Sequence, residues 1–335
     1  ARDHSRPARQ ARRRLHGHTG VVTPGHQRHM LAGKRKRDQQ RRILSIDGGG
    51  IRGIIPAKVL ARIEQLTQAK IADLFDVIAG TSSGGARRLR LTCPGEGKRP
   101  RQAALDCVAP SGKRGAAIVT RPILPAAEKI FWPEYSPKPL EKALADYLGD
   151  ARLKDALTRV TVTAYETERR RPFFFRSTRA AENPDEYDYF MRDVARATSA
   201  APTYFPTHKI DTTPSDHYAL VDGGVFANNP GMCAYVDALK EVSSGDDVIM
   251  VSLGTGSLTR PLTYDEIKSW GEARWVQPLL SVMLAGVAAT TAYPPGHILG
   301  QGTYLRLQTQ LDDPHVALRH ARPHHNDNTP PPATP

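Results

Sequence analysis

The stretch Phe75-Asp76-Val77-Ile78-Ala79-Gly80-Thr81-Ser82-Ser83-Gly84 joins a short apolar run to a Gly-x-Ser-x-Gly pattern. The apolar run predicts a buried strand, and the pattern after it is typical of a sharp strand-to-helix turn that exposes a serine hydroxyl. Backbones crowd at such a turn, so side chains at positions 80 and 84 would clash and glycine is favoured there. Ser82 is therefore the candidate nucleophile.

The sequence around this stretch alternates between strand and helix patterns. Residues 43–46 form an apolar run that ends in Asp47-Gly48-Gly49-Gly50, and a helical pattern follows with Pro56 in its first turn. Because strand, helix, strand is the order expected of a parallel sheet, we predict one three-layer α/β domain over residues 43–310. Further strands are predicted at 160–164, 173–175, 218–221 and 248–253, and the clearest helices at 140–148, 188–197 and 231–242.

Asp222 is the candidate base for this serine. It follows the apolar run Ala219-Leu220-Val221 and begins an Asp-Gly-Gly turn, at the strand end where ligands bind in open α/β sheets. A carboxylate in a dry cleft can accept the hydroxyl proton directly, because desolvation raises its pKa. The alternative for Asp222 is a structural role in an Asx turn. Surface or packing roles are expected for three histidines that could otherwise serve as the base, His208, His217 and His297.

Residues 47–53, Asp-Gly-Gly-Gly-Ile-Arg-Gly, form a glycine turn before the first predicted helix. Exposed N–H groups at Gly48, Gly49 and Gly50 could stabilise the oxyanion that develops when an ester carbonyl is attacked. The same residues fit Gly-x-Gly-x-x-Gly, so a dinucleotide-binding Rossmann unit is the rival interpretation. That unit requires an acidic residue at the end of the second strand, where this chain has Gly80-Thr81-Ser82. The oxyanion interpretation is therefore favoured.

The positive charge of the chain is concentrated in two segments. The formal net charge is +13, but residues 1–42 hold 13 Lys/Arg and residues 85–122 hold nine. The rest of the chain is slightly acidic, so a nucleic-acid partner is not expected. Residues 1–42 and 311–335 have no helical or strand period and are predicted to be disordered tails.

Cysteine usage and hydropathy indicate a cytoplasmic protein. Cys93, Cys107 and Cys233 are too scattered for a disulfide framework or a zinc site. The basic N-terminus is not followed by an apolar run, and no stretch approaches about 20 apolar residues, so neither a signal peptide nor a transmembrane segment is predicted. Residues 279–289 predict at most a buried helix.

Three motifs, at residues 47–53, 80–85 and 222–224, together resemble those of patatin-like phospholipases. Residues 197–205 and 251–256 are also similar to that family, and the resemblance extends over residues 43–84 and 125–310. It implies a three-layer α/β/α patatin-like fold with a mostly parallel central sheet. It also implies calcium-independent hydrolysis of acyl esters in phospholipids or other membrane lipids, without a cofactor or a metal.

The resemblance assigns the roles residue by residue. Ser82 and Asp222 would form a Ser-Asp dyad without histidine, and Gly48 to Gly50 would form the oxyanion hole. Arg52 would hold the loop or meet a phosphate, although a solvated arginine is an open alternative. Peripheral contact with a membrane is expected of such an enzyme. The residues expected to support these motifs are Arg52, Gly53, Gly80, Gly84, Gly223 and Gly224.

Residues 86–122 depart from the pattern of this family. The helix behind the nucleophile should be largely apolar, whereas residues 86–91 read Ala-Arg-Arg-Leu-Arg-Leu. Because burying an unpaired arginine is unfavourable, we expect either a helix displaced toward solvent or a segment of unnatural sequence, as after a shifted reading frame. The alternative function is then a catalytically impaired patatin-like protein that acts as a membrane-binding or scaffold module.

Overall fold

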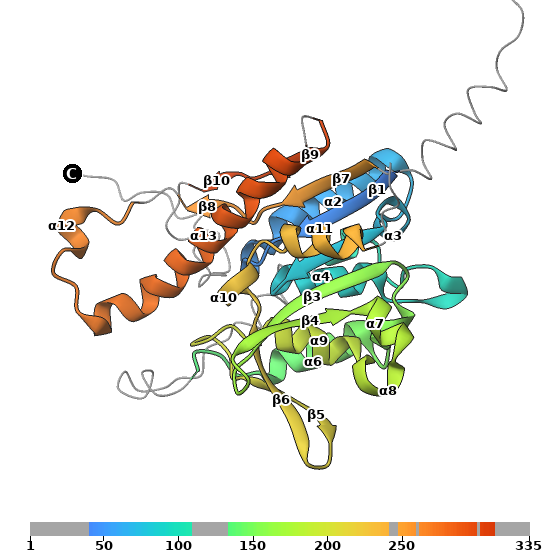
Figure 1. Cartoon of the computed structure of the whole chain (residues 1–335), viewed down its shortest axis with the longest axis horizontal. Helices are drawn as coiled ribbons and strands as arrows, with labels where there is room; N and C mark the ends of the chain where they lie inside the picture. The colour runs from blue at the N-terminus through green and yellow to red at the C-terminus, as the bar shows by residue number, and fades with distance from the viewer. Residues whose placement is uncertain (1–39, 109–132, 241–246, 259–260, 300–301, 312–335) are drawn as a thin grey trace, which may run out of the picture. The chain divides into compact units, whose positions relative to one another are not determined.

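The computed structural model describes residues 40–108, 133–240, 247–258, 261–299 and 302–311 (Figure 1). The predicted tails before residue 40 and after residue 311 lie outside the described residues, as does the segment 109–122. Gln40, Arg41 and Arg42, which the sequence analysis assigned to the basic tail, belong instead to the first strand. The folded part therefore begins three residues earlier than predicted.

An eight-stranded sheet forms the centre of the described structure, and every predicted strand lies in it. Its strand order is β5-β6-β3-β2-β1-β7-β9, and β4 pairs with β3. A second sheet pairs β8 (Ser257–Leu258) with β10 (Gln310–Leu311). The strands of the central sheet are β1 (Gln40–Ile46), β2 (Val77–Thr81), β3 (Arg159–Glu166), β4 (Arg171–Arg176), β5 (His208–Thr213), β6 (Asp216–Asp222), β7 (Asp247–Leu253) and β9 (Tyr304–Leu307).

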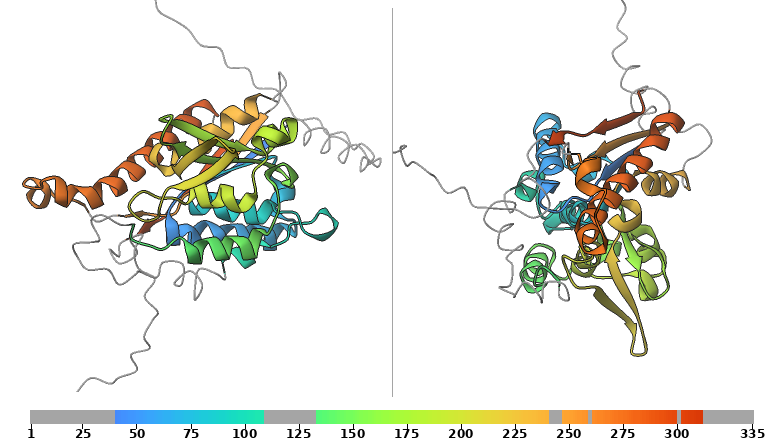
Figure 2. Two further views of the ribbon diagram at one scale, coloured as in Figure 1. Left: turned by 90° about the horizontal axis from the view of Figure 1, so that it is seen from below. Right: turned by 90° about the vertical axis from the view of Figure 1, so that its left-hand side faces the viewer.

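Helices cover both faces of this sheet and make the three layers that were predicted (Figures 1 and 2). On one face α2 packs on Leu44, Ile46 and Ile78. On the other face α11 packs on Ile43 and Ala79. The helices are α2 (Ile54–Thr67), α3 (Ile71–Leu74), α4 (Ser83–Thr92), α6 (Lys138–Leu148), α7 (Ser177–Glu182), α8 (Pro184–Tyr187), α9 (Met191–Thr198), α10 (Gly224–Ala227), α11 (Gly231–Leu239), α12 (Tyr264–Ile267) and α13 (Glu272–Ile298), with short 3-10 turns η1 (Gly50–Gly53), η2 (Glu96–Lys98), η3 (Ala104–Cys107) and η6 (Leu153–Asp155).

Strand direction brings the candidate site residues to one edge of the sheet. β1, β2, β3, β7 and β9 run parallel, so the residues after β1 and β2 emerge together. β6 runs antiparallel to β3, a direction that the sequence did not predict. Asp222 nevertheless lies at this edge. Its partner on β3 is Ala164, and the residue before Ala164, Thr163, pairs with Thr81 at the end of β2.

Helix α4 keeps its place against the sheet despite its arginines, so the predicted displacement toward solvent is wrong. Arg88 is fully buried, and its Nη1 donates to the carbonyl oxygens of Ile78 at 2.7 Å and Thr161 at 2.5 Å. Arg90 donates to the Gln102 side chain at 2.6 Å and lies over the ring of Tyr147. Backbone carbonyls thus satisfy Nη1 of Arg88, whereas its Nε and Nη2 have no hydrogen-bond partner among the described residues, and burial lowers the pKa of Arg88 to about 9. The ring of Tyr147 covers the guanidinium of Arg90.

Helix α13 contains the segment that was predicted to be a buried helix, and the prediction of burial is wrong. Its side chains at Leu279, Val282 and Met283 are 46%, 46% and 49% exposed. Among the described helices, none combines the length and apolar character needed to cross a membrane.

Candidate active site

Ser82 occupies the turn between β2 and α4. Its backbone has φ 56°, a left-handed conformation that a non-glycine residue adopts only when the surroundings hold it. Its N–H donates to Thr198 Oγ1 at 2.8 Å, and Thr198 Oγ1 donates in turn to the Thr163 carbonyl at 2.7 Å. A Cβ at Gly80 or Gly84 would lie within 3.0 Å of neighbouring backbone atoms, so the two motif glycines permit the close approach that the turn requires.

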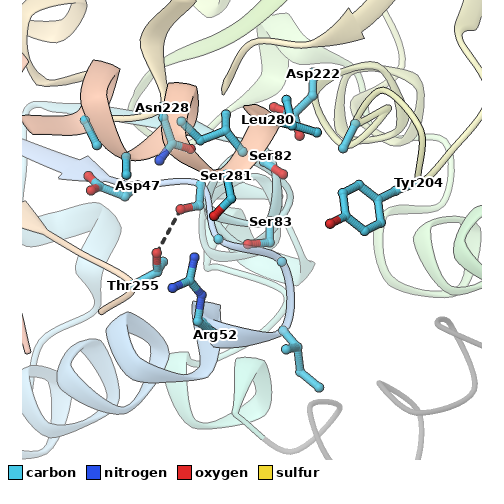
Figure 3. Close-up of a pocket in the computed structure, with 18 of the residues that line it drawn as sticks. Asp47, Arg52, Ser82, Ser83, Tyr204, Asp222, Asn228, Thr255, Leu280 and Ser281 are labelled. Carbon is cyan, nitrogen blue, oxygen red and sulfur yellow. Dashed lines mark hydrogen bonds between the residues drawn. The ribbon is translucent and has the colours of Figure 1, made fainter. Parts of the chain in front are cut away.

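Asp222 ends β6, and its carboxylate lies beside the Ser82 side chain (Figure 3). Its Oδ1 accepts the N–H of Gly224 at 2.8 Å. Burial raises the pKa of Asp222 to about 7, although the Ser82 hydroxyl and the Gly224 N–H favour the ionised form. The backbone at Gly223 passes so close to Thr163 that a Cβ there would lie 2.5 Å from the Thr163 backbone. The structure therefore brings together the two predicted catalytic residues, which are 140 positions apart in sequence.

The glycine loop of residues 48–50 lies beside Ser82, as the sequence predicted. A Cβ at Gly48 would lie 3.2 Å from Ser82 Cβ, and the Gly48 carbonyl accepts the Thr255 hydroxyl at 2.8 Å (Figure 3). The Gly48 N–H, however, donates to the Asn228 carbonyl at 2.9 Å, so it is not a free donor. Within the described residues, no acceptor contacts the N–H groups of Gly49 and Gly50. These two are the available donors of the loop.

Asp47 anchors the start of this loop through a buried ion pair with Arg306 of β9. Arg306 Nη1 lies 2.8 Å from Asp47 Oδ1, and Nη2 lies 2.5 Å from Oδ2, which is a bidentate geometry. Arg306 Nη1 also donates to Ser252 Oγ at 2.7 Å. The pair joins the end of β1 to β7 and β9, so it fixes where the glycine loop begins.

Arg52 and Gly53 complete the loop motif. Arg52 is half-buried, and its Nη1 donates to the Gly256 carbonyl at 3.1 Å, which links η1 to the segment after β7. Gly53 leaves room for the Arg87 guanidinium, which a Cβ at that position would meet at 2.0 Å.

A cavity of about 1170 Å³ opens over the edge of the sheet where these residues meet. Ser82, Asp222 and Gly48 to Gly50 all line it. Most of the remaining lining is apolar and comes from α6 and α13, including Leu140, Leu144, Leu280 and Leu284. Figure 3 shows Ser82, Ser83 and Tyr204 facing this space, with Leu280 and Ser281 of α13 also lining it. The cavity is therefore large enough and apolar enough for an acyl chain next to a serine.

The three histidines that the sequence set aside lie away from this cavity. His208 is near Asp193, His217 contacts Glu168, and His297 contacts the Tyr293 carbonyl; none of the three lines the cavity. In the part of the chain that the structure describes, no group of three or more His, Cys, Asp or Glu is arranged to hold a metal ion.

Four contributors to the site were not identified from sequence. Thr198, Asn228, Thr255 and Arg306 each contact the nucleophile turn or the glycine loop from a different element. Thr198 and Thr255 lie in stretches whose similarity to the patatin-like family was noted, but no role could be read from it. Arg306 had no local signal, because an arginine in a short strand has no distinguishing pattern.

Comparisons with known proteins point to one family. A family model described as "Patatin-like phospholipase" matches residues 44–234. Patatin-T5 from Solanum tuberosum is 33% identical over 309 residues, which cover 81% of this chain and 78% of that protein. Patatin-15 from the same plant is 33% identical over 316 residues, or 83% of this chain and 80% of that protein. The crystal structure of VipD from Legionella pneumophila gives a TM-score of 0.36 at 12% identity over 84% of this chain and 65% of that chain, a value too low to support an argument.

Proposed function

We propose that this chain, which belongs to the patatin-like phospholipase family and is a lipid acyl hydrolase, cleaves acyl esters of phospholipids through a dyad of Ser82 and Asp222. The observation that carries the proposal is the position of Ser82 beside a buried carboxylate whose pKa is raised to about 7 (Figure 3). A base with this pKa is about half ionised at neutral pH, and it is basic enough to accept a proton.

The reaction would proceed in two steps. In the first, Asp222 takes the proton of Ser82 Oγ while Oγ attacks the ester carbonyl, and the protonated Asp222 then donates to the leaving alcohol. In the second, Asp222 takes a proton from a water molecule while the water oxygen attacks the acyl-Ser82 ester. The bond between the acyl carbon and Ser82 Oγ then breaks, the protonated Asp222 returns the proton to Oγ, and the fatty acid leaves. One carboxylate thus serves as base and acid in turn, which is consistent with the absence of any histidine from the cavity lining.

The oxyanion donors would be the N–H groups of Gly49 and Gly50. Gly48 would instead hold the loop through Asn228 and Thr255, in contrast to the predicted hole of three glycines. Fixed backbone donors stabilise a developing negative charge without reorganising. Because the base and the donors all come from the chain, we propose that hydrolysis is independent of calcium.

The argument for a catalytically impaired scaffold rested on a displaced helix behind Ser82. That support is lost, since α4 packs against β2 and the cavity retains Ser82 and Asp222 in its lining. The active-enzyme proposal is therefore the one that we test.

Ser82→Ala and Asp222→Asn should each lower the rate of fatty-acid release from phosphatidylcholine vesicles by roughly 10⁴-fold or more. The assay contains a calcium chelator, and wild-type activity should be unaffected by it. A fluorophosphonate probe should label wild type and fail to label Ser82→Ala.

Matched controls come from the exposed hairpin of β5 and β6. Ser215→Ala and Asp211→Asn make the same chemical changes far from the cavity and should leave activity within twofold of wild type. Full activity in Ser82→Ala or Asp222→Asn would overturn the dyad, and loss of wild-type activity with chelator would overturn calcium independence.

A further inference from the structure

Helix α13 exposes large apolar side chains along one side. Leu279, Met283 and Tyr293 are 46%, 49% and 68% exposed, and their spacing places them within one face of an α-helix. Gly286 lies between Met283 and Tyr293, and no atom lies within 4 Å of the place that a Cβ would occupy there, so this part of the helix is uncovered. We call Leu279, Met283 and Tyr293 the outer face of α13. Several large apolar side chains exposed on one face of a helix indicate an interaction surface.

The composition of the helix restricts what this surface can bind. Residues 275–298 contain no Asp, Glu, Lys or Arg. This stretch therefore cannot bind a partner through ion pairs. Its composition suits contact with an uncharged apolar surface. No described helix is suited to span a membrane, so α13 would have to lie in the plane of an interface.

The same helix forms a wall of the candidate active site. Leu280, Leu284 and Ala288 line the cavity, and Leu284 Cδ2 would lie 2.9 Å from a Cβ at Gly224, two residues after Asp222. Figures 1 and 2 show α13 running from α12 past α10 toward β9. One helix thus presents apolar residues to the cavity and to the outside.

Aromatic residues lie near both ends of the uncharged stretch. Trp270, just before the stretch, packs edge to face at 5.6 Å on Trp275, its first residue, and both rings also line the mouth of the cavity. Tyr293 lies near the other end of the stretch. Tyr264 of α12 is 77% exposed. Trp and Tyr are enriched at the boundary between lipid headgroups and acyl chains, where an apolar ring with a polar group is stable.

From these observations we propose that the outer face of α13, with the aromatic residues at its ends, docks on the surface of a zwitterionic lipid bilayer. The docked helix would hold the cavity against the membrane, so that a lipid acyl chain could pass from the bilayer to Ser82 along α13. The proposal rests on the lipid acyl hydrolase function proposed above. Docking would depend on burial of apolar side chains and would therefore change little with salt, unlike an electrostatic tether.

The test is binding of the full chain to phosphatidylcholine vesicles, measured by flotation at 0.1 M and 0.5 M salt. Leu279→Gln with Met283→Gln should lower the partition coefficient at least tenfold at both salt concentrations. Neither residue lines the cavity, so hydrolysis of a water-soluble short-chain ester should remain within twofold of wild type. That soluble assay separates the two proposals, because it depends on the dyad and requires no membrane.

The matched control replaces two exposed leucines elsewhere, Leu66→Gln on α2 with Leu105→Gln on η3, which are 66% and 59% exposed in the native protein. This control should bind vesicles as wild type does. Equal binding by wild type and the α13 variant would overturn the docking surface. Dimerisation of wild type that the α13 variant abolishes, with vesicle binding unchanged, would instead assign the outer face to a second copy of this chain.

Discussion

Asp47 and Asp222 each end a buried strand and each begin an Asp-Gly-Gly turn, but their surroundings differ in one respect. Asp47 faces the guanidinium of Arg306 in a bidentate pair. Asp222 faces only the neutral Ser82 hydroxyl and the Gly224 N–H. Burial raises the pKa of both carboxyls, and Arg306 opposes that effect at Asp47.

The difference shows how one sequence pattern serves two purposes. With a counter-charge, the buried carboxyl group is held in a bidentate ion pair and fixes the loop that carries the proposed oxyanion donors. Without one, the buried carboxylate keeps a high proton affinity, which is the property that a general base requires. The presence or absence of one arginine, supplied from a distant strand, separates the two roles.

The largest expected effect comes from removing the counter-charge. Arg306→Met leaves the Asp47 carboxylate buried and unpaired, so the free energy of unfolding should fall by roughly 3–5 kcal/mol. The measurement is urea denaturation at pH 7, in which the m-value should stay the same while the midpoint falls. The control is Lys209→Met, which removes an exposed pair with Asp211 at 2.6 Å and should leave the free energy of unfolding close to that of wild type. Equal losses in the two variants would contradict the anchoring role of Arg306.

The same substitution at the two aspartates should have opposite effects on stability. The pKa of Asp222 is about 7 in the folded protein and near 3.8 when unfolded, so the folded state binds more protons between these values. The stabilising contribution of the protonated group is complete below about pH 4 and is lost as the pH rises through 7. Asp222→Asn should therefore match wild type at pH 4 and exceed its free energy of unfolding by up to about 4 kcal/mol at pH 8.

Asp47→Asn should destabilise the protein at pH 8, because it leaves Arg306 without its carboxylate. Urea denaturation of wild type, Asp222→Asn and Asp47→Asn at pH 4 and pH 8 measures whether each substitution raises or lowers the free energy of unfolding. A gain of stability in Asp47→Asn at pH 8, or none in Asp222→Asn, would show that the two carboxyls do not differ as described.

The smallest effect concerns rate. If Asp222 is the base, kcat/KM for a neutral soluble ester should fall about tenfold per pH unit below pH 7 and level off above it, since only the ionised carboxylate accepts the proton. Circular dichroism at each pH checks that the protein stays folded. A flat profile between pH 5 and pH 8 would exclude a base with this pKa.

The sequence predicted six of the eight strands of the central sheet, the nucleophile turn and the three layers, because each depends on local patterns. Strands β5 and β9 were not predicted. An apolar run before Gly80 and Asp-Gly-Gly turns after two strands are visible within a few residues. Arg306 and Thr198 could not be assigned in this way, since their roles depend on which strands become neighbours. The antiparallel direction of β6 is a further property of the whole sheet that its own residues do not encode.

The predictions for helices α4 and α13 were wrong because each places a side chain where its type is unusual. Arg88 is buried on α4, and Leu279 is exposed on α13. Sequence reasoning placed each by its side-chain type, the arginine toward solvent and the leucine in the core. Carbonyl groups of β2 and β3 supply acceptors for Arg88, and the cavity occupies the space that a core would need beside α13. Neither circumstance can be read from the helix alone.

The pair of Asp47 and Arg306 also sets an order of events during synthesis. The two residues are 259 positions apart, and a ribosome that adds roughly 5–20 residues per second needs roughly 13 to 50 s to cover that distance. A nascent chain that already contains Ser82 and Asp222 still lacks the arginine that holds the glycine loop. The proposed oxyanion donors can therefore be anchored only after β9 has been made, so a growing chain carries the proposed nucleophile well before it can carry a complete site.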